Sequence, residues 1–292
     1  MLHLHYYVGI SGSGKTTIAK YRATPEEVIL SSDAIRAQLW GDATDQQNPQ
    51  KVFDTMFKEA VAALHAGKNV HYDSTGLSMK HRLHFIKSIR SQFSNDELAL
   101  HCIVVAAPIE ECIERNNSRE RVVPEHVIWK QAKSFHVPVE NEGWDDIVIF
   151  HNSVHSGESY QRDILDKLTN FGDQKNSHHS LSLIQHSVSC MVNLKSKNEN
   201  MTEAAFFHDC GKLYTQTFWS KDNYAEAHYP NHAELGSYIA LGCGLLLHTA
   251  QLICYHMRPY EGELARKTWK ERLGEQLWND LLILHEADCS AH

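Results

Sequence analysis

The stretch "VGISGSGKTT", residues 8–17, decides the fold of the first half of the chain. From Gly9 to Thr16 it matches the pattern GxxxxGK[ST] without a mismatch. Glycines let backbone N–H groups curl around a phosphate, and the N-terminus of a following helix adds a positive dipole end. The apolar run before it, "LHLHYYV" (residues 2–8), predicts a strand, and residues 15–21 predict a helix. The stretch therefore predicts a phosphate-binding loop between a strand and a helix.

Two side chains of this loop have the chemistry to bind a nucleotide and its metal. Lys15 is predicted to reach the β- and γ-phosphates of ATP, and the Thr16 hydroxyl is predicted to bind Mg²⁺. ATP and Mg²⁺ are therefore the expected ligands. The alternative, a chance glycine-rich turn, is disfavoured by the strand and helix around the loop. The other predicted nucleotide contacts are Gly12, Ser13, Gly14 and Thr17.

Further strands and helices alternate after this loop. Residues 51–67, after Pro49, carry a helical periodicity, and residues 110–116 also predict a helix. The run "LALHCIVVAAP" is apolar almost throughout, which is typical of a strand buried on both faces of a parallel sheet. Residues 1–152 are therefore predicted to form a three-layer α/β domain. Short apolar runs predict its later strands at 28–30, 69–72, 98–108 and 146–150.

The character of the sequence changes after residue 152. The stretch "HNSVHSGESY" (residues 151–160) is polar, and residues 153–175 are predicted to be a linker. Residues 176–292 contain long stretches with helical periodicity and no convincing strand. An all-α domain is therefore predicted for the second half.

Composition limits the partners and the location. The net charge is −8 and neither half has an excess of basic residues, so a long contact with a nucleic-acid duplex is not expected. A short nucleic-acid end or a small molecule remains open. The seven cysteines include no CxxC pair, as in a cytoplasmic protein with reduced thiols. The first residues do not resemble a signal peptide, and no stretch approaches the roughly 18 apolar residues of a membrane span, so we expect no membrane partner.

Charged residues follow the predicted strands of the first half. Asp33 is placed to take a proton from an acceptor hydroxyl, and Arg36, one helical turn later, to pair with an acceptor phosphate. The alternative is a helix-capping aspartate with a solvated arginine. Asp73 ends a strand, where it is placed to hold a Mg²⁺-bound water or to brace Arg36, unless it is a simple turn residue. Arg119 and Arg121 are placed either on a lid that neutralises charge during phosphoryl transfer or on a solvated face.

Together, the motifs "GISGSGKTT", "SSDAIR", "YDST" and "RNNSRERVVPEHV" resemble the phage-type 5′-hydroxyl polynucleotide kinases, over about the first 150 residues. Thr75 departs from the family, which often has an asparagine two residues after the strand-end aspartate, so acceptor contacts near Thr75 are not carried over. The resemblance implies that Lys15 and Thr16 bind ATP and Mg²⁺ and that Asp33 is the general base toward a 5′-hydroxyl. It also implies that Arg36 contacts the acceptor and that Arg119 or Arg121 belongs to a lid.

The second half carries an ordered set of histidines and aspartates. Imidazole and carboxylate ligands suit borderline divalent metals such as Mn²⁺, Fe²⁺, Co²⁺, Ni²⁺ or Zn²⁺. Asp209 follows His208 directly and is placed to bridge two ions, or to hold one ion beside an activated water. The chain has 21 histidines, so a single one is more often a surface or core residue, and only spacing supports a ligand. The set is His179, His186, His208, Asp209, His232, His256 and Asp288.

The motifs "HHSLSLIQHSV", "FHDCGK", "NHAELG", "YHMRP" and "HEADCSA" resemble, in this order, the HD-type phosphohydrolase domain. The resemblance covers the whole second half. It implies one metal site from His186, His208, Asp209 and Asp288, a second ion or the substrate phosphate at His232 and His256, and phosphate contacts from Lys212 and His179.

A kinase and a phosphohydrolase that acted on the same position would cancel each other, whereas at different ends they prepare a broken strand for ligation. The chain resembles combined kinase–HD end-healing proteins. This resemblance implies phosphorylation of 5′-OH ends of RNA or DNA, hydrolysis of 2′,3′-cyclic, 2′- or 3′-phosphate ends, and an RNA ligase as a further partner.

Two alternatives stay open. One is a metabolic nucleoside or small-molecule kinase fused to a nucleotide phosphohydrolase, which the acidic composition favours. The other is a non-catalytic HD half that binds a nucleotide and regulates the kinase.

Overall fold

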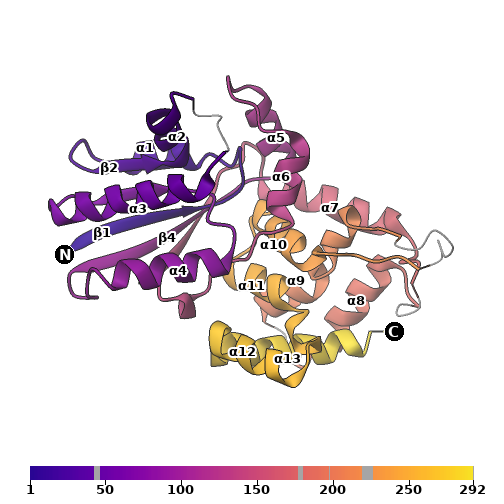
Figure 1. Ribbon diagram of the computed structural model, residues 1–292. Coiled ribbons are helices and arrows are strands. Elements are labelled where there is room, and N and C mark those ends of the chain that lie inside the picture. The colour runs from indigo at the N-terminus through magenta and orange to yellow at the C-terminus, as the bar shows by residue number, and fades with distance from the viewer. Residues whose placement is uncertain (43–46, 177–179, 197, 219–225, 292) are drawn as a thin grey trace. The chain divides into compact units, whose positions relative to one another are not determined.

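The computed structural model describes residues 1–42, 47–176, 180–196, 198–218 and 226–291 (Figure 1). The chain divides into two compact units. The first unit comprises Met1–Ala106, Glu110–Ile128 and Glu142–Asn152, and the second comprises Ala107–Ile109, Trp129–Asn141 and Ser153–His292. The domain boundaries expected from the sequence, at residues 152 and 176, stay a prediction.

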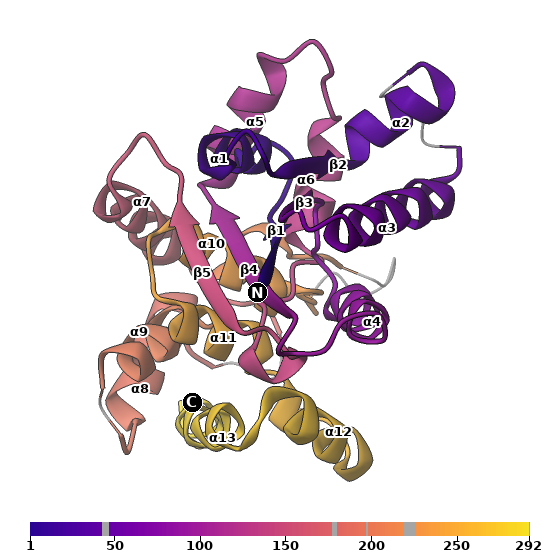
Figure 2. The same cartoon turned by 90° about the vertical axis from the view of Figure 1, so that its left-hand side faces the viewer.

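A parallel five-stranded sheet forms the centre of the first unit. Its strand order is β2-β3-β1-β4-β5, and Figure 2 shows β1 between β3 and β4. The order places the ends of β1 and β3 side by side, so the loop after β1 lies next to the residue that ends β3. The predicted parallel sheet is confirmed. Its strands are β1 (Leu2–Val8), β2 (Val28–Ser31), β3 (Val70–Asp73), β4 (Leu98–Ala106) and β5 (Asp146–His151).

Helices cover both faces of this sheet, which makes three layers. The helices up to β5 are α1 (Lys15–Arg22), α2 (Ser32–Trp40), α3 (Pro49–His65), α4 (Met79–Arg90), α5 (Ile109–Asn117) and α6 (Glu125–Ala132). On one face, Tyr7 of β1 packs in a buried cluster with Ala19 of α1. On the other face, the ring of Tyr6 lies 4.7 Å from the ring of Phe85 in α4. Neighbouring residues of a strand point to opposite faces, so β1 contributes to both layers of core.

The second unit is largely helical, as predicted, and among its described residues only isolated β-bridges occur. Helix α7 lies inside the segment expected to be a linker. Its N-terminus is capped by Ser156, which accepts a hydrogen bond from the Ser159 N–H, and it buries Ile164 and Leu168. The helices are α7 (Gly157–Phe171), α8 (Leu183–Asn193), α9 (Glu199–Phe207), α10 (His232–Gly242), α11 (Leu247–Tyr255), α12 (Glu263–Leu273) and α13 (Glu275–Cys289), with 3₁₀ turns η1 (Glu140–Glu142), η2 (Cys210–Tyr214) and η3 (Arg258–Tyr260).

In the part of the chain that the structure describes, every helix is too short or too polar to cross a lipid bilayer.

Candidate active sites

The phosphate-binding loop connects β1 to α1, as the sequence predicts. Gly12 and Gly14 have φ angles of +87° and +98°, in the left-handed region that favours glycine. Backbone turns of this kind let successive N–H groups converge on an anion. A Cβ atom on Gly12 would lie 2.0 Å from the carbonyl oxygen of Cys112. The loop is also held by Asn152, whose Nδ2 donates to the carbonyl oxygen of Ser13 at 2.7 Å.

Lys15 and Thr16, the first residues of α1, lie at the end of this loop. Lys15 is buried, and its Nζ donates to the carbonyl oxygen of Ile10 at 2.8 Å. Burial lowers the pKa of Lys15, which Asp73 partly offsets. The Thr16 hydroxyl donates to Asp73 Oδ2 at 2.6 Å. A hydroxyl next to a carboxylate supplies the hard oxygen donors that Mg²⁺ prefers, so these two residues fit the predicted magnesium site.

Asp33, Arg36 and Arg121 form a second group in the same unit. Arg36 NH1 donates to Asp33 Oδ1 at 3.0 Å, and Arg121 NH1 donates to the same oxygen. The cap of helix α2 is Ser31, whose side chain accepts from the Ala34 N–H, so the alternative that Asp33 caps this helix is wrong. Arg36 is buried, and its Nε atom has no hydrogen-bond partner among the described residues. The group thus combines an exposed carboxylate with a guanidinium that still has a donor to offer.

The segment after α5 carries the two arginines expected to form a lid. Buried Asn116 holds this segment: its Oδ1 accepts from the Val123 N–H at 2.9 Å, and its Nδ2 donates to the Val123 carbonyl at 2.8 Å. Arg121 contacts Asp33, as described above. Arg119 is exposed, yet its charge contributes to lowering the pKa of Lys15, after burial. Both arginines therefore act electrostatically on the predicted kinase residues.

In the second unit, six predicted ligands meet although they come from different elements. His186 lies in α8 and Asp288 in α13; His208 and His256 follow the last residues of α9 and α11; His232 begins α10. Most of the group is buried, with His186, His208, Asp209 and His256 each at most 3% exposed. Burial of so many ionisable groups is costly unless they are paired or bind metal.

The four imidazoles share one hydrogen-bonding pattern. Each Nδ1 donates to a backbone carbonyl oxygen at 2.8 Å: His186 to Ala291, His208 to Ala205, His232 to Tyr229 and His256 to Ile253. The Nδ1 atoms therefore carry the protons, and the Nε2 atoms point into the cluster. This tautomer is the one found where histidine binds a metal through Nε2.

Asp209 faces both pairs of imidazoles. Its Oδ2 lies 3.3 Å from His208 Nε2 and 3.5 Å from His186 Nε2. Its Oδ1 lies 3.3 Å from His232 Nε2 and 3.8 Å from His256 Nε2. Within each pair the two Nε2 atoms are 3.2 Å apart, close enough to repel unless a proton or a cation lies between them. The geometry fits a carboxylate that bridges two ions.

The electrostatics of the cluster favour cation binding. Burial disfavours ionisation of Asp209, but Lys212 and His208 lower the pKa of Asp209 well below its ordinary value. Burial also disfavours the charged form of His208, but Asp209 and Asp288 raise the pKa of His208 well above its usual range. Burial and His208 lower the pKa of His256 to about 3. The carboxylates therefore stay ionised, and His256 stays neutral with a lone pair to offer.

Gly211 and Lys212, two and three residues after Asp209, shape the cluster. Lys212 Nζ donates to Asp209 Oδ2 at 2.6 Å and to Gln174 Oε1 at 2.7 Å, so the ammonium holds the Asp209 carboxylate in place. The predicted phosphate contact of Lys212 stays a prediction. A Cβ atom on Gly211 would lie 2.0 Å from the carbonyl oxygen of His232, so only glycine lets η2 approach α10 this closely.

Asp288 completes the first group of ligands. Its Oδ1 lies 3.0 Å from His186 Nε2 and 3.5 Å from His208 Nε2. Its Oδ2 accepts from the Tyr260 hydroxyl at 2.8 Å. The two imidazoles of His186 and His208 and the carboxylate of Asp288 lie close enough together to share one ion. The nitrogen and oxygen donors fit the borderline divalent metals expected from the sequence.

Four polar residues that position these sites escape sequence-based prediction: Asn116, Asn152, Gln174 and Tyr260. Apart from Asn116, each acts on a residue at least 28 positions away in the chain, and no local motif marks such a residue. The predicted phosphate contact His179 lies outside the described residues.

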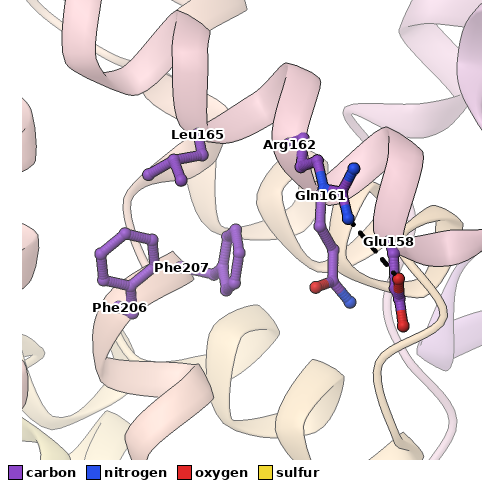
Figure 3. Close-up of a pocket in the computed structure, with 6 residues that line it drawn as sticks. All are labelled: Glu158, Gln161, Arg162, Leu165, Phe206 and Phe207. Carbon is purple, nitrogen blue, oxygen red and sulfur yellow. Dashed lines mark ion pairs between the residues drawn. The ribbon is translucent and has the colours of Figure 1, made fainter.

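A pocket in the second unit lies between α7 and α9 (Figure 3). Glu158, Gln161, Arg162 and Leu165 of α7 and Phe206 and Phe207 of α9 line it. None of the predicted site residues is among them.

Two family models match the chain. The model of the AAA domain matches residues 4–138, and the model of the HD domain matches residues 176–291. No curated protein sequence gives a significant match.

Solved structures match with low similarity. A chain of the Pnkp1/Rnl/Hen1 RNA repair complex is 23% identical with a TM-score of 0.37, over 44% of this chain and 42% of that chain. A gluconokinase from Sinorhizobium meliloti is 15% identical with a TM-score of 0.36, over 53% of this chain and 83% of that chain. The present chain therefore spans less than half of the RNA-repair chain that it matches.

Proposed function

The chain joins a P-loop domain of the AAA type to an HD domain, and from this premise we propose that it heals RNA ends with two separate activities. The first is ATP-dependent phosphorylation of 5′-hydroxyl ends. The second is metal-dependent hydrolysis of 2′,3′-cyclic, 2′- or 3′-phosphate ends. The observation that carries the proposal is the presence in one chain of two complete sets of groups, a phosphate loop with an aspartate–arginine pair and a buried histidine–aspartate cluster.

In the proposed transfer, Asp33 accepts the proton of the 5′-hydroxyl as its oxygen attacks the γ-phosphorus of ATP. Arg36 binds the phosphate next to that hydroxyl through its guanidinium, whose Nε donor has no partner among the described residues. Lys15 neutralises the phosphates of ATP, and Arg121 holds the Asp33 carboxylate in place. Bound at Thr16 and Asp73, Mg²⁺ would supply further charge neutralisation.

In the proposed hydrolysis, the cluster around Asp209 orients water and the phosphate end. A divalent ion held there supplies Lewis acidity, which makes water a nucleophile near neutral pH. The chain presents four inward-facing Nε2 atoms, the Asp209 carboxylate and the Asp288 carboxylate. Lys212 fixes Asp209 between the two imidazole pairs. Attack of water on phosphorus breaks one bond to a ribose oxygen, which takes up a proton from the water and becomes a hydroxyl. A 2′,3′-cyclic end is thereby opened to a 2′- or 3′-phosphate, and a second attack by water releases that phosphate as inorganic phosphate.

The products of both reactions are substrates for one further reaction class. A 5′-phosphate and a free 3′-hydroxyl are the ends that an RNA ligase joins, so we propose that such a ligase acts after this protein.

Single substitutions test the two-site proposal. Asp33→Asn is expected to abolish label transfer from ATP to 5′-hydroxyl RNA and DNA oligonucleotides, and to leave hydrolysis of a 2′,3′-cyclic phosphate end unchanged. Asp209→Ala is expected to do the reverse. The exposed residues Asp96 and Asp166 serve as matched controls, with Asp96→Asn and Asp166→Ala expected to preserve both activities. If either active-site variant loses both reactions while circular dichroism shows a folded protein, the proposal fails.

A metabolic kinase is the second candidate, favoured by the net charge of −8. It would phosphorylate nucleosides or other small molecules rather than strand ends. A panel of nucleosides and sugars, assayed with labelled ATP beside the oligonucleotides, separates the two. Label on small molecules alone would replace the RNA proposal by this one.

A further inference from the structure

A row of histidines crosses one face of the sheet in the first unit, near the middle of the strands. His5 of β1 is in register with His71 of β3 and His101 of β4. The ring of His5 lies 4.7 Å from the ring of His71 and 4.8 Å from the ring of His101. Residues in register on neighbouring parallel strands share a face, so the pairing of β1 with both neighbours creates this row. The proposed reactions use none of these three residues.

A fixed carboxylate closes one end of the row. Glu27, in the turn before β2, has its Oε2 atom 3.2 Å from His71 Nε2. The same oxygen accepts from the Thr24 N–H at 2.8 Å, and Oε1 accepts from Asn69 Nδ2 at 2.9 Å. Burial opposes ionisation of Glu27, but these donors and His71 lower its pKa to about 2. The carboxylate is therefore ionised and held in one position.

One ring nitrogen of His5, the Nδ1 atom, is buried. Its Nδ1 makes no hydrogen bond among the described residues. His71, in contrast, has its Nδ1 2.9 Å from the Tyr7 hydroxyl. A hydroxyl donates or accepts, so Tyr7 can keep this contact when the opposite nitrogen, Nε2, gives up its proton to bind a cation. Buried polar atoms normally have a partner, so this nitrogen, lying in a row of imidazoles, is a candidate ligand for an ion.

We propose that His5, Glu27 and His71 bind a divalent ion of the zinc type. One ligand atom from each residue lies within 4.8 Å of the other two. Two imidazoles and a carboxylate are a common donor set for such ions. His5 and Glu27 are partly exposed, which gives the ion a route of entry. The bound ion ties together β1, β3 and the turn before β2, so its role is structural.

One charge near the site opposes the ion. The charge of Arg22 acts on the imidazole of His5 and contributes to lowering the pKa of His5, after burial and the imidazoles of His71 and His101. Arg22 is exposed, and its guanidinium lies over the ring of Phe150, 5.2 Å from the ring centre. Replacing Arg22 with glutamine is therefore expected to tighten binding of the cation.

The test measures Zn²⁺ binding by the full chain in which His208→Ala and Asp209→Ala remove ligands of the HD domain. Isothermal titration with Zn²⁺ alone is expected to show one bound ion per chain. Glu27→Gln and His71→Gln are each expected to weaken the binding by about tenfold or more. The exposed His84 provides the matched control, with His84→Gln expected to bind as tightly as the parent. Arg22→Gln is expected to bind more tightly.

Absence of Zn²⁺ binding by the parent, or equal affinity of the parent and both ligand variants, overturns the proposal. Anomalous diffraction from zinc in crystals of the unsubstituted chain gives a second measurement. It does not depend on whether any variant folds. A peak between His5, Glu27 and His71 supports the site, and zinc found only at the HD cluster overturns it. Both measurements read metal content, so they are independent of the proposed enzyme activities.

Discussion

At the scale of single residues, the ends of helices orient two histidines of the cluster around Asp209. His208 and His256 follow the last residues of α9 and α11, and each donates from Nδ1 to a carbonyl three residues earlier. The last carbonyls of a helix lack partners within the helix, so a histidine placed there gains a hydrogen bond and a fixed tautomer. His186 reaches the same tautomer through the carbonyl of Ala291, which is distant in sequence.

Tyr260 performs this orienting role for Asp288. Tyr260→Phe removes the hydroxyl that donates to Asp288 Oδ2, so the carboxylate is free to rotate away from His186. Loss of such a partner typically weakens metal binding by about 10- to 100-fold. We expect a Mn²⁺ titration to show a loss in this range. Exposed Tyr21 is the control, and an equal loss in Tyr21→Phe, or no loss in Tyr260→Phe, contradicts the assignment.

Residues with a local motif are the ones that sequence predicts. Lys15 and Thr16 stand in a fixed pattern, and the structure places them at the start of α1 beside Asp73. The partners of Asn116 and Tyr260 could not be predicted, because a buried polar contact depends on the tertiary arrangement.

At the scale of elements, the phosphate loop depends on close backbone approach. Gly12→Ala combines a left-handed φ angle with a clash against the carbonyl of Cys112, so the loop must shift. We expect the affinity for ATP to fall by about tenfold or more, because the loop N–H groups that face the phosphates move with the backbone and a hydrogen bond to a charged group contributes about 1.5–3 kcal/mol. Gly67→Ala is the matched control: Gly67 also has a left-handed φ angle, of +77°, but open space around it. It is expected to lose about 1 kcal/mol of stability and to keep ATP affinity. Titration with a fluorescent ATP analogue measures the ATP affinity of both variants. Equal affinities of Gly12→Ala and Gly67→Ala would refute the role of the contact with Cys112.

The arginine segment after α5 depends on a single side chain. Asn116→Ala removes both hydrogen bonds to the partly buried Val123 backbone, at a cost of about 0.5–1.5 kcal/mol for each hydrogen bond. We expect kinase kcat/KM to fall at least tenfold and the HD phosphohydrolase rate to stay unchanged. Replacement of exposed Asn95 by alanine should change neither. Wild-type kinase kinetics in Asn116→Ala would show that the segment needs no such support.

Strands of the first unit are predictable from apolar runs, but their neighbours in the sheet are not. The row of His5, His71 and His101 exists only because β1 lies between β3 and β4. Helix α7 was not predicted for another reason: it opens with polar residues that are typical of a linker, and it buries only Ile164 and Leu168.

At the scale of the whole molecule, two compact units carry the two proposed sites separately. Ligands that bind only the folded form stabilise the unit that holds them, by about 2.7 kcal/mol at 100 times the Kd. We therefore expect Mg²⁺ and ATP to slow hydrogen exchange in β1 to β4, and a chelator followed by Mg²⁺ to speed exchange in α8 to α13. Hydrogen-exchange mass spectrometry of the full chain measures both. Equal responses of both units to each treatment would show that the sites are coupled.

The contact between Gly211 and the carbonyl of His232 has a consequence for the geometry of hydrolysis. It is the hydrogen atom of this glycine that sets how near the pair of His232 and His256 comes to the pair of His186 and His208. The methyl group of Gly211→Ala is therefore expected to push His232 and His256 away from His186 and His208. The distance between the two imidazole pairs therefore depends on the absence of a side-chain carbon atom at residue 211.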